Sequence, residues 1–169
     1  MLFNFSKLKE LALLKVIMSF VIAFLVFDVL VSKVSIGFND TDSISGRVFL
    51  IIKQSYPHQK MDKIIFDINN SHTHHRDKTL IKRVLGFEGD TVSRKDNCIF
   101  LNQKNIGKIK PKSLSGNILE SLIQDGQTVV IPKGYYFVYS PHKDSYDSRY
   151  KSIGLISKKR VMGVAYEIF

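Results

Sequence analysis

Acidic residues and cysteine are both scarce in this sequence of 169 residues. Asp and Glu number 15 against 25 Lys and Arg, which gives a net charge of +10 at pH 7. The single cysteine, Cys98, excludes an internal disulfide, and a lone thiol in an apolar run is typical of a packed small side chain rather than a nucleophile. The basic runs lack an aromatic platform on which bases could stack, so no nucleic acid is expected. An anionic membrane surface is the simpler partner for this charge.

A long apolar run near the N-terminus predicts a membrane anchor. Residues 11–31 are interrupted only by Lys15, Ser19 and Asp28, and about 20 apolar residues suffice for a helix to cross a hydrocarbon core of about 30 Å. A cleaved signal peptide is the alternative, but the run outlasts an ordinary signal core and no small-x-small cleavage pattern follows it. We therefore expect a cytoplasmic N-terminus and transmembrane anchor over 1–34, and one globular domain over 35–169.

The charges on the two sides of this run predict its orientation. Lys7, Lys9 and Lys15 lie on the N-terminal side, whereas Asp40 and Asp42 follow soon after the span. Basic residues are enriched on the cytoplasmic side of membrane helices. The sequence thus predicts a cytoplasmic N-terminus, with the remaining domain on the other side of the membrane.

The rest of the chain has the pattern of a mainly β domain. Short β-type runs recur, separated by turn residues such as Gly, Pro, Asn and Asp, and no internal repeat is visible. Only 113–123 has any helical appearance, and we expect a loop or a single helical stretch there. The predicted strands are 47–53, 63–68, 80–85, 98–101, 128–131, 135–139 and 161–168.

Three local patterns follow the anchor in an informative order. The first is Asn39-x-Thr41-x-Ser43, directly beyond the apolar run. The second is a lysine-bearing stretch in the middle of the chain, and the third is Asp-Ser-Arg-Tyr near the C-terminus. The matching positions of the last two are Lys82, Arg83, Val84, Gly86, Gly89 and Asp90, then Asp147, Ser148, Arg149 and Tyr150.

The lysine-bearing stretch resembles the K-R-V-x-G-x-x-G-D box of type I signal peptidases, and the third pattern resembles the D-S-R-Y box of that family. The first pattern resembles the nucleophile segment of the TraF-type branch, the conjugative-transfer peptidases that process pilin subunits. The resemblance covers most of the chain from Asn39 onward. It implies a signal-peptidase-like β catalytic domain, in a mainly β fold with one N-terminal transmembrane helix, facing the periplasm from the bacterial inner membrane.

The same resemblance assigns roles to residues of this chain. Ser43 is the implied nucleophile and Lys82 the general base. The implied oxyanion donors are the backbone N–H of Ser43 and the hydroxyl of Thr41. Asp147 and Arg149 are expected to hold the site together as a charge-assisted pair, and Ser148 to orient the Lys82 amine. Gly86, Gly89 and Asp90 are expected to form a structural turn after the lysine strand.

Physical chemistry explains why such a lysine has to be buried. A serine hydroxyl needs an unprotonated base within hydrogen-bond reach. A lysine has a pKa of about 10.4 in water, and burial lowers it by disfavouring the charged form. Lys82 lies among Leu80, Ile81, Val84 and Leu85, and strand alternation puts it on the same face as Leu80 and Val84. This run predicts a buried lysine.

Departures from the common family pattern bear on the substrate. Ile44 follows the serine where methionine is usual, and Ser45 replaces a frequent proline. Together with the Asn39-x-Thr41-x-Ser43 pattern, these differences favour the pilin-processing branch over a housekeeping leader peptidase. The predicted activity is thus cleavage of signal peptides or pilin precursors at the outer face of the membrane, with a precursor protein and membrane lipid as partners. Whether the acyl-enzyme is released by water or by an amine stays open.

Other interpretations stay open beside this one. A non-catalytic, membrane-anchored β module that binds a secretion or conjugation component would keep the anchor and the turns, but would not need Lys82 on a buried face. His72, His74 and His75 lie close to Asp77, but no cysteine pair accompanies them, so a solvated loop is expected and no metal or organic cofactor is predicted. Phe38, Phe49 and Phe66 suit either an apolar underside at the membrane interface or a β core.

Overall fold

The computed structural model describes residues 5–41, 43–68 and 79–169, and the side chains from Lys9 onward. The chain divides into two compact units, Met1–Ser35 and Ile36–Phe169, each of which is described here by itself. The first contains α1 (Phe5–Ser32). Its segment Lys9–Ser32 is long and apolar enough to cross a membrane by length and composition, and at 1.5 Å per residue it spans about 36 Å.

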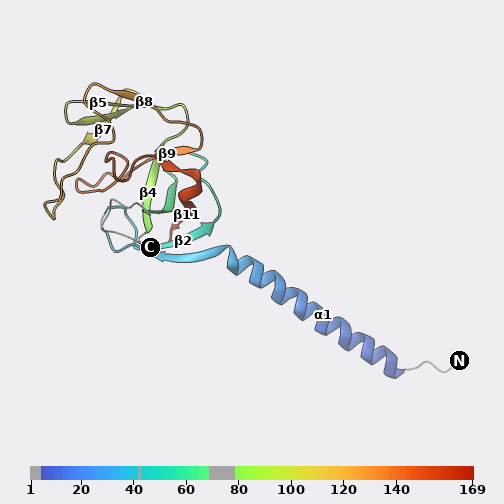
Figure 1. Cartoon of the computed structure of the whole chain (residues 1–169). Helices are drawn as coiled ribbons and strands as arrows, with labels where there is room; N and C mark the ends of the chain where they lie inside the picture. The colour runs from blue at the N-terminus through green and yellow to red at the C-terminus, as the bar shows by residue number, and fades with distance from the viewer. Residues whose placement is uncertain (1–4, 42, 69–78) are drawn as a thin grey trace. The chain divides into compact units, whose positions relative to one another are not determined.

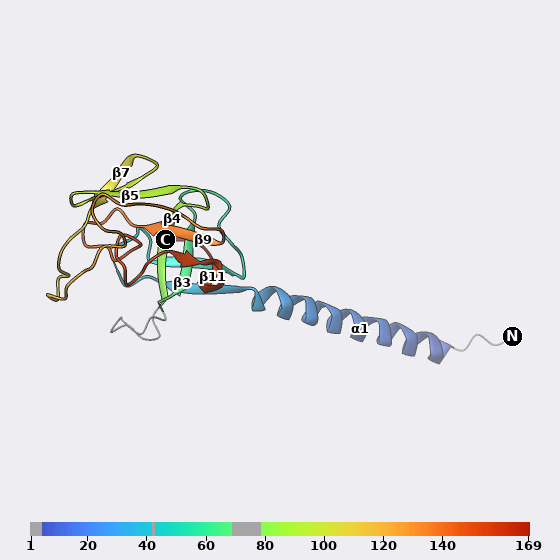
Figure 2. The same cartoon turned by 45° about the horizontal axis from the view of Figure 1, so that its top comes forward.

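The second unit is built from two antiparallel sheets (Figures 1 and 2). The larger has the strand order β1-β2-β11-β3-β4-β9-β10, and the smaller has the order β7-β6-β5-β8. The large sheet is formed by β1 (Val34–Phe38), β2 (Val48–Lys53), β3 (Lys63–Asp67), β4 (Thr79–Gly86), β9 (Tyr135–Tyr139), β10 (Ile156–Ser157) and β11 (Val161–Glu167). The small sheet is formed by β5 (Thr91–Lys95), β6 (Cys98–Leu101), β7 (Lys104–Lys108) and β8 (Thr128–Val130), and a 3-10 turn, η1 (Lys158–Arg160), precedes β11.

Alternation of apolar residues explains how the large sheet buries one face. In β3, Ile64 and Phe66 are buried while their neighbours are half-buried, and β2 has the same alternation. β11, the last strand of the chain, pairs with both β2 and β3. The final strand therefore joins the part of the sheet that follows residue 47 to the part that carries Lys82.

The mainly β fold with an N-terminal apolar helix is confirmed. The predicted strands all form, within two residues of their expected ends, whereas four short strands (β1, β5, β7 and β10) were not predicted. Residues 113–123 contain turns and isolated bridges and no helix. Phe49 and Phe66 are fully buried in the core, whereas Phe38 is exposed, so the three phenylalanines do not form one surface.

Candidate active site

Lys82 lies in the middle of β4, on its buried face. Lys82, Val84 and Gly86 alternate with less buried residues along this strand, as the sequence pattern predicts, and only 2% of Lys82 is exposed. Ile64 is its partner residue on β3. Arg83 points the other way and donates a hydrogen bond of 3.3 Å to Ser45 Oγ. The strand thus places one amine inside the domain and one guanidinium outside it.

Ser43 lies on the loop between β1 and β2, which we call the nucleophile loop after the role expected for Ser43 (residues 39–47, of which Asp42 lies outside the described residues). Lys82 Nζ lies 2.8 Å from Ser43 Oγ. Ile44, which directly follows Ser43, is buried in a cluster with Phe49, Ile51 and Ala165. The apolar Ile44 therefore fixes the loop to the core on one side of the serine, and the fold brings together two residues 39 positions apart.

A second hydroxyl contacts the amine of Lys82. Lys82 Nζ donates to Ser145 Oγ at 3.1 Å. Ser148, which was expected at this place, has its hydroxyl elsewhere. It donates to the carbonyl of Gly154 at 2.7 Å and accepts from the backbone N–H of Val138 at 3.0 Å. The prediction for Ser148 is corrected, because the loop turns so that Ser145 and not Ser148 faces β4.

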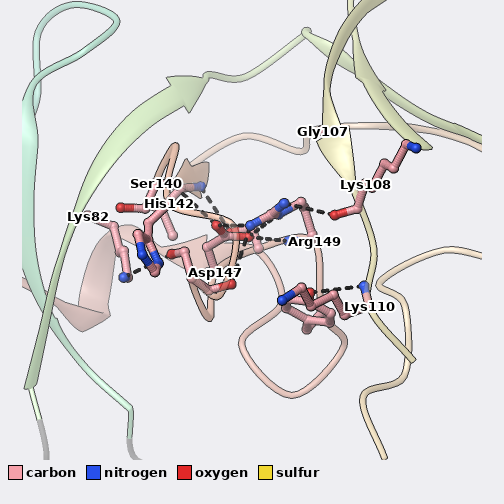
Figure 3. Close-up of polar contacts among 12 residues, drawn as sticks. Lys82, Gly107, Lys108, Lys110, Ser140, His142, Asp147 and Arg149 are labelled. Carbon is pink, nitrogen blue, oxygen red and sulfur yellow. Dashed lines mark hydrogen bonds and ion pairs between the residues drawn. The ribbon is translucent and has the colours of Figure 1, made fainter. Parts of the chain in front are cut away.

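Asp147 and Arg149 form a buried, bidentate ion pair. Arg149 Nε and Nη2 lie 2.8 and 3.0 Å from the two carboxylate oxygens of Asp147, and Figure 3 shows the pair between Lys82 and Lys108. Arg149 also donates to the carbonyls of Lys108 (2.9 Å) and Ser145 (3.3 Å). The pair therefore ties the Ser145 segment to the end of β7.

Ser140 connects this ion pair to the nucleophile loop. Its backbone N–H donates to Asp147 Oδ2 at 3.2 Å, and its hydroxyl donates to the backbone carbonyl of Ser43. Ser140 is fully buried. Sequence reasoning missed both Ser140 and Ser145. A signal for Ser145 is present in the chain, because Asp144-Ser145 repeats the Asp147-Ser148 pair three residues earlier.

Burial lowers the pKa of the Lys82 amine from its ordinary 10.5 to about 8. The Asp147 carboxylate opposes this shift, and the charge of Arg149 adds to it. Burial also disfavours the charge of Arg149, but the hydrogen bond and charge of Asp147 outweigh it and raise the Arg149 pKa above its ordinary value. The site thus holds a readily neutralised amine close to a guanidinium that stays charged.

Thr41 and Asn39 continue the hydrogen bonds beyond Ser43. Thr41 Oγ1 lies 2.9 Å from Ser43 Oγ and donates to Asn39 Oδ1 at 2.9 Å. The backbone N–H of Ser43 belongs to the same turn. The two expected oxyanion donors therefore come from adjacent parts of one loop, and their role stays a prediction.

The glycines that follow Lys82 have structural reasons to be there. A Cβ on Gly86 would lie 2.5 Å from Ile131 Cδ1 and 2.9 Å from Phe137 Cβ, at a register shift between β4 and β9. Gly89 has φ +86°, a conformation that favours glycine. Asp90 accepts from the backbone N–H of Phe87 at 2.9 Å and closes the turn.

An open pocket of about 730 Å³ adjoins the candidate site at Ser145. Its walls include Lys110 and Asp144, which form an ion pair, and the rings of Tyr146 and Tyr150. No cluster of metal-binding side chains occurs in the part of the chain that the structure describes. His72, His74 and His75 lie outside the described residues, so their expected role is untested.

Comparison with known proteins identifies the family of this chain. The family model described as "Signal peptidase, peptidase S26" matches residues 8–169. The chain belongs to this family. Similar members include a signal peptidase I of Bacillus licheniformis, 36% identical over 115 residues (64% of this chain and 57% of that protein), and signal peptidase I T of Bacillus subtilis (strain 168), 34% identical over 93 residues (53% and 48%).

The chain spans about half the length of these curated family members. A crystal structure of a signal peptidase I from Enterococcus faecalis V583 compares with it at a TM-score of 0.40 and 24% sequence identity, covering 66% of this chain and 98% of that chain.

Proposed function

We propose that this chain is a membrane-anchored serine endopeptidase that cleaves signal peptides from precursor proteins, with Ser43 as nucleophile and Lys82 as general base. One observation carries the proposal. Lys82 Nζ lies 2.8 Å from Ser43 Oγ while its side chain is buried and its pKa is lowered to about 8. A base near the working pH and in contact with a hydroxyl is what nucleophilic activation of serine needs.

The proposed reaction runs through an acyl-enzyme. Neutral Lys82 takes the Ser43 proton as Ser43 Oγ attacks the carbonyl carbon of the scissile peptide bond, and the carbonyl oxygen takes up the negative charge. The Lys82 ammonium then gives its proton to the departing amine as the C–N bond breaks. A water molecule, deprotonated by the regenerated amine, releases the peptide from Ser43. Ser145 is placed to orient the amine through both steps.

The backbone N–H of Ser43 and the hydroxyl of Thr41 are the proposed donors to the oxyanion. Preorganised donors that meet developing charge contribute strongly to catalysis. The position of Thr41 Oγ1, 2.9 Å from Ser43 Oγ, supports this role. The carbonyl of Ser43 is held by Ser140, which fixes the peptide plane on the other side of the nucleophile.

We place the enzyme in the inner membrane with one span, a cytoplasmic N-terminus and a catalytic domain on the periplasmic face, in contact with lipid. The apolar helix α1 supports the span, and the lysines before it support the orientation. A nucleophile about ten residues beyond the span would meet precursors that emerge from the same bilayer.

Two precursor classes are candidates as substrates. The relatives named signal peptidase I support ordinary signal peptides. The Asn39-x-Thr41-x-Ser43 pattern supports pilin precursors, and with them a role in conjugative transfer or type IV secretion. The alternative of a non-catalytic binding module is disfavoured because it gives no reason to bury Lys82 against a serine.

The test is processing of a co-expressed panel of signal-peptide and pilin precursors by the wild-type chain, Ser43→Ala and Lys82→Ala. Loss of processing in both variants, at normal abundance and membrane insertion, would support the dyad and identify the precursor class. Ser93→Ala, on β5 of the other sheet, is the matched serine control and should process normally. Full processing by Ser43→Ala or Lys82→Ala would overturn the mechanism and favour the binding module.

A further inference from the structure

A backbone hydrogen bond of Asn39 closes the nucleophile loop at its base. The backbone N–H of Asn39 donates to the carbonyl of Arg47 at 2.9 Å. The side chain of Asn39 is half-buried and turns into the loop that this bond closes. We propose that Asn39 is a positioning residue that holds Ser43 and Thr41 in their working geometry. Its kinetic consequences rest on the proposed peptidase function.

The amide nitrogen of Asn39 serves the backbone of the loop. Asn39 Nδ2 lies 2.8 Å from the carbonyl oxygen of Thr41 and 3.1 Å from those of Ile44 and Gly46. These three carbonyls flank the nucleophile on both sides. Backbone carbonyls that turn inward need donors, and the two N–H groups of one amide supply them here, with one hydrogen shared between two carbonyls. The position of Ser43 therefore depends on a side chain that does not touch it.

The amide oxygen of Asn39 serves Thr41. It accepts from the backbone N–H of Thr41 at 3.2 Å and from its hydroxyl at 2.9 Å. An amide oxygen only accepts, so the hydroxyl hydrogen of Thr41 points to Asn39, and Thr41 Oγ1 is left to accept the hydrogen of Ser43.

The resting hydrogen bonds consequently run in one direction, from the Lys82 ammonium to Ser43, Thr41 and Asn39. Attack requires two changes in this series of hydrogen bonds. The Ser43 hydrogen has to turn toward neutral Lys82, and the Thr41 hydrogen has to leave Asn39 for the oxyanion. Asn39 thus sets where the nucleophile lies and which way its hydrogen bonds point before substrate arrives.

The experiment compares Asn39→Ala and Asn39→Asp in the full chain with Asn102→Ala. Asn102 is a matched control, because its amide also accepts from a backbone N–H (Thr91, 2.8 Å) and donates to a side chain (Asp90, 2.6 Å), but it lies in the turn between β6 and β7 and not in the nucleophile loop. Asn39→Asp keeps the acceptor oxygen and replaces the donor with a second oxygen that faces the three carbonyls.

Both Asn39 variants should lower kcat about 100-fold, with an unchanged KM and an unchanged pH midpoint, since a displacement of about 1 Å at a reacting group costs that much. Thermal unfolding should show them fully folded at the assay temperature. A kcat within twofold of the wild type for Asn39→Asp, or a fall matched by Asn102→Ala, would overturn the proposal.

A second measurement does not depend on activity. Hydrogen exchange of the peptide 39–47 should become about tenfold faster in Asn39→Ala, because its backbone contacts are lost, while exchange of β4 stays unchanged. If the wild-type chain cleaves no precursor, the proposed function fails, and this measurement alone decides the positioning role. Unchanged exchange in the nucleophile loop would then overturn it.

Discussion

Two buried cations of this domain, Lys82 and Arg149, are treated in opposite ways. They are 2% and 3% exposed. Arg149 has a bidentate carboxylate partner, and its pKa is raised. Among the described residues Lys82 forms no ion pair: it contacts two hydroxyls, and its pKa falls to about 8. The difference teaches that burial alone does not decide the role of a charged side chain. A paired cation stabilises the structure, whereas an unpaired one has a lowered pKa and is suited to the base role proposed for Lys82.

The largest expected effect comes from unpairing Arg149. Asp147→Asn keeps the shape of the side chain but leaves a buried guanidinium without a counter-charge, which should destabilise the domain by about 3–5 kcal/mol. Thermal or urea unfolding measures this. Lys151→Met, which breaks the exposed pair with Glu120, is the control and should lose far less. Equal losses in the two variants would show that the buried pair of Asp147 and Arg149 stabilises the domain no more than an exposed pair does.

Replacing Lys82 should do the reverse and stabilise the domain. The folded-state pKa of about 8 lies below the ordinary 10.5, so the unfolded chain binds more protons between these values and stability rises with pH across this window. Below pH 8 the full cost of the buried charge is present. Lys82→Met removes it and should add about 3 kcal/mol at pH 7, with a flatter stability profile between pH 8 and 10. A loss of stability at pH 7 in Lys82→Met would show that burying the charged amine does not destabilise the domain.

Giving Lys82 an acidic partner should turn it into a paired cation, as Arg149 is. Ser145→Asp places a carboxylate beside the amine, where an opposite charge typically raises a lysine pKa by 1–3 units. We expect kcat/KM at pH 7 to fall about 100-fold and the midpoint of the pH profile to move upward. Ser145→Ala removes the contact without adding charge and should leave the midpoint in place. An unchanged midpoint in Ser145→Asp would show that the pH profile of kcat/KM does not report the titration of Lys82.

The wild-type chain itself should show a pH-dependent activity. Only the neutral amine accepts the Ser43 proton, so kcat/KM should rise about tenfold per pH unit at low pH and level off above about 8. A cleavage assay between pH 5.5 and 9.5 measures the midpoint. A rate that is flat from pH 6 to 9 would contradict Lys82 as the base.

The sequence predicted the lysine side of the site better than the serine side. Lys82 stands in a strand whose alternation is readable from Leu80 to Val84, and its box has a fixed spacing. The nucleophile loop has no such period, and its geometry depends on Asn39, whose bonds to three carbonyls follow from the fold of the loop. Ser140 directly follows β9, and the position of β9 depends on its pairing with β4, a strand that is distant in the sequence.

The exchange of Ser148 for Ser145 has a similar cause. Both serines follow an aspartate, and neither lies in a strand, so alternation does not say which one faces Lys82. The buried pair of Asp147 and Arg149 decides it, because Arg149 holds the carbonyl of Ser145. Short strands such as β5 and β7 escaped prediction because they carry charged residues and offer few apolar positions, with Val92 the one fully buried residue of β5 and none buried in β7.

The place of β11 in the large sheet has a consequence for biosynthesis. β11 lies between β2, which follows the nucleophile loop, and β3, which pairs with the strand of Lys82. The strands next to Ser43 and Lys82 are therefore joined through β11, a strand that follows both residues in the sequence. Until β11 has been synthesised these two parts of the sheet cannot pair through it, so we expect Ser43 and Lys82 to come together late in folding.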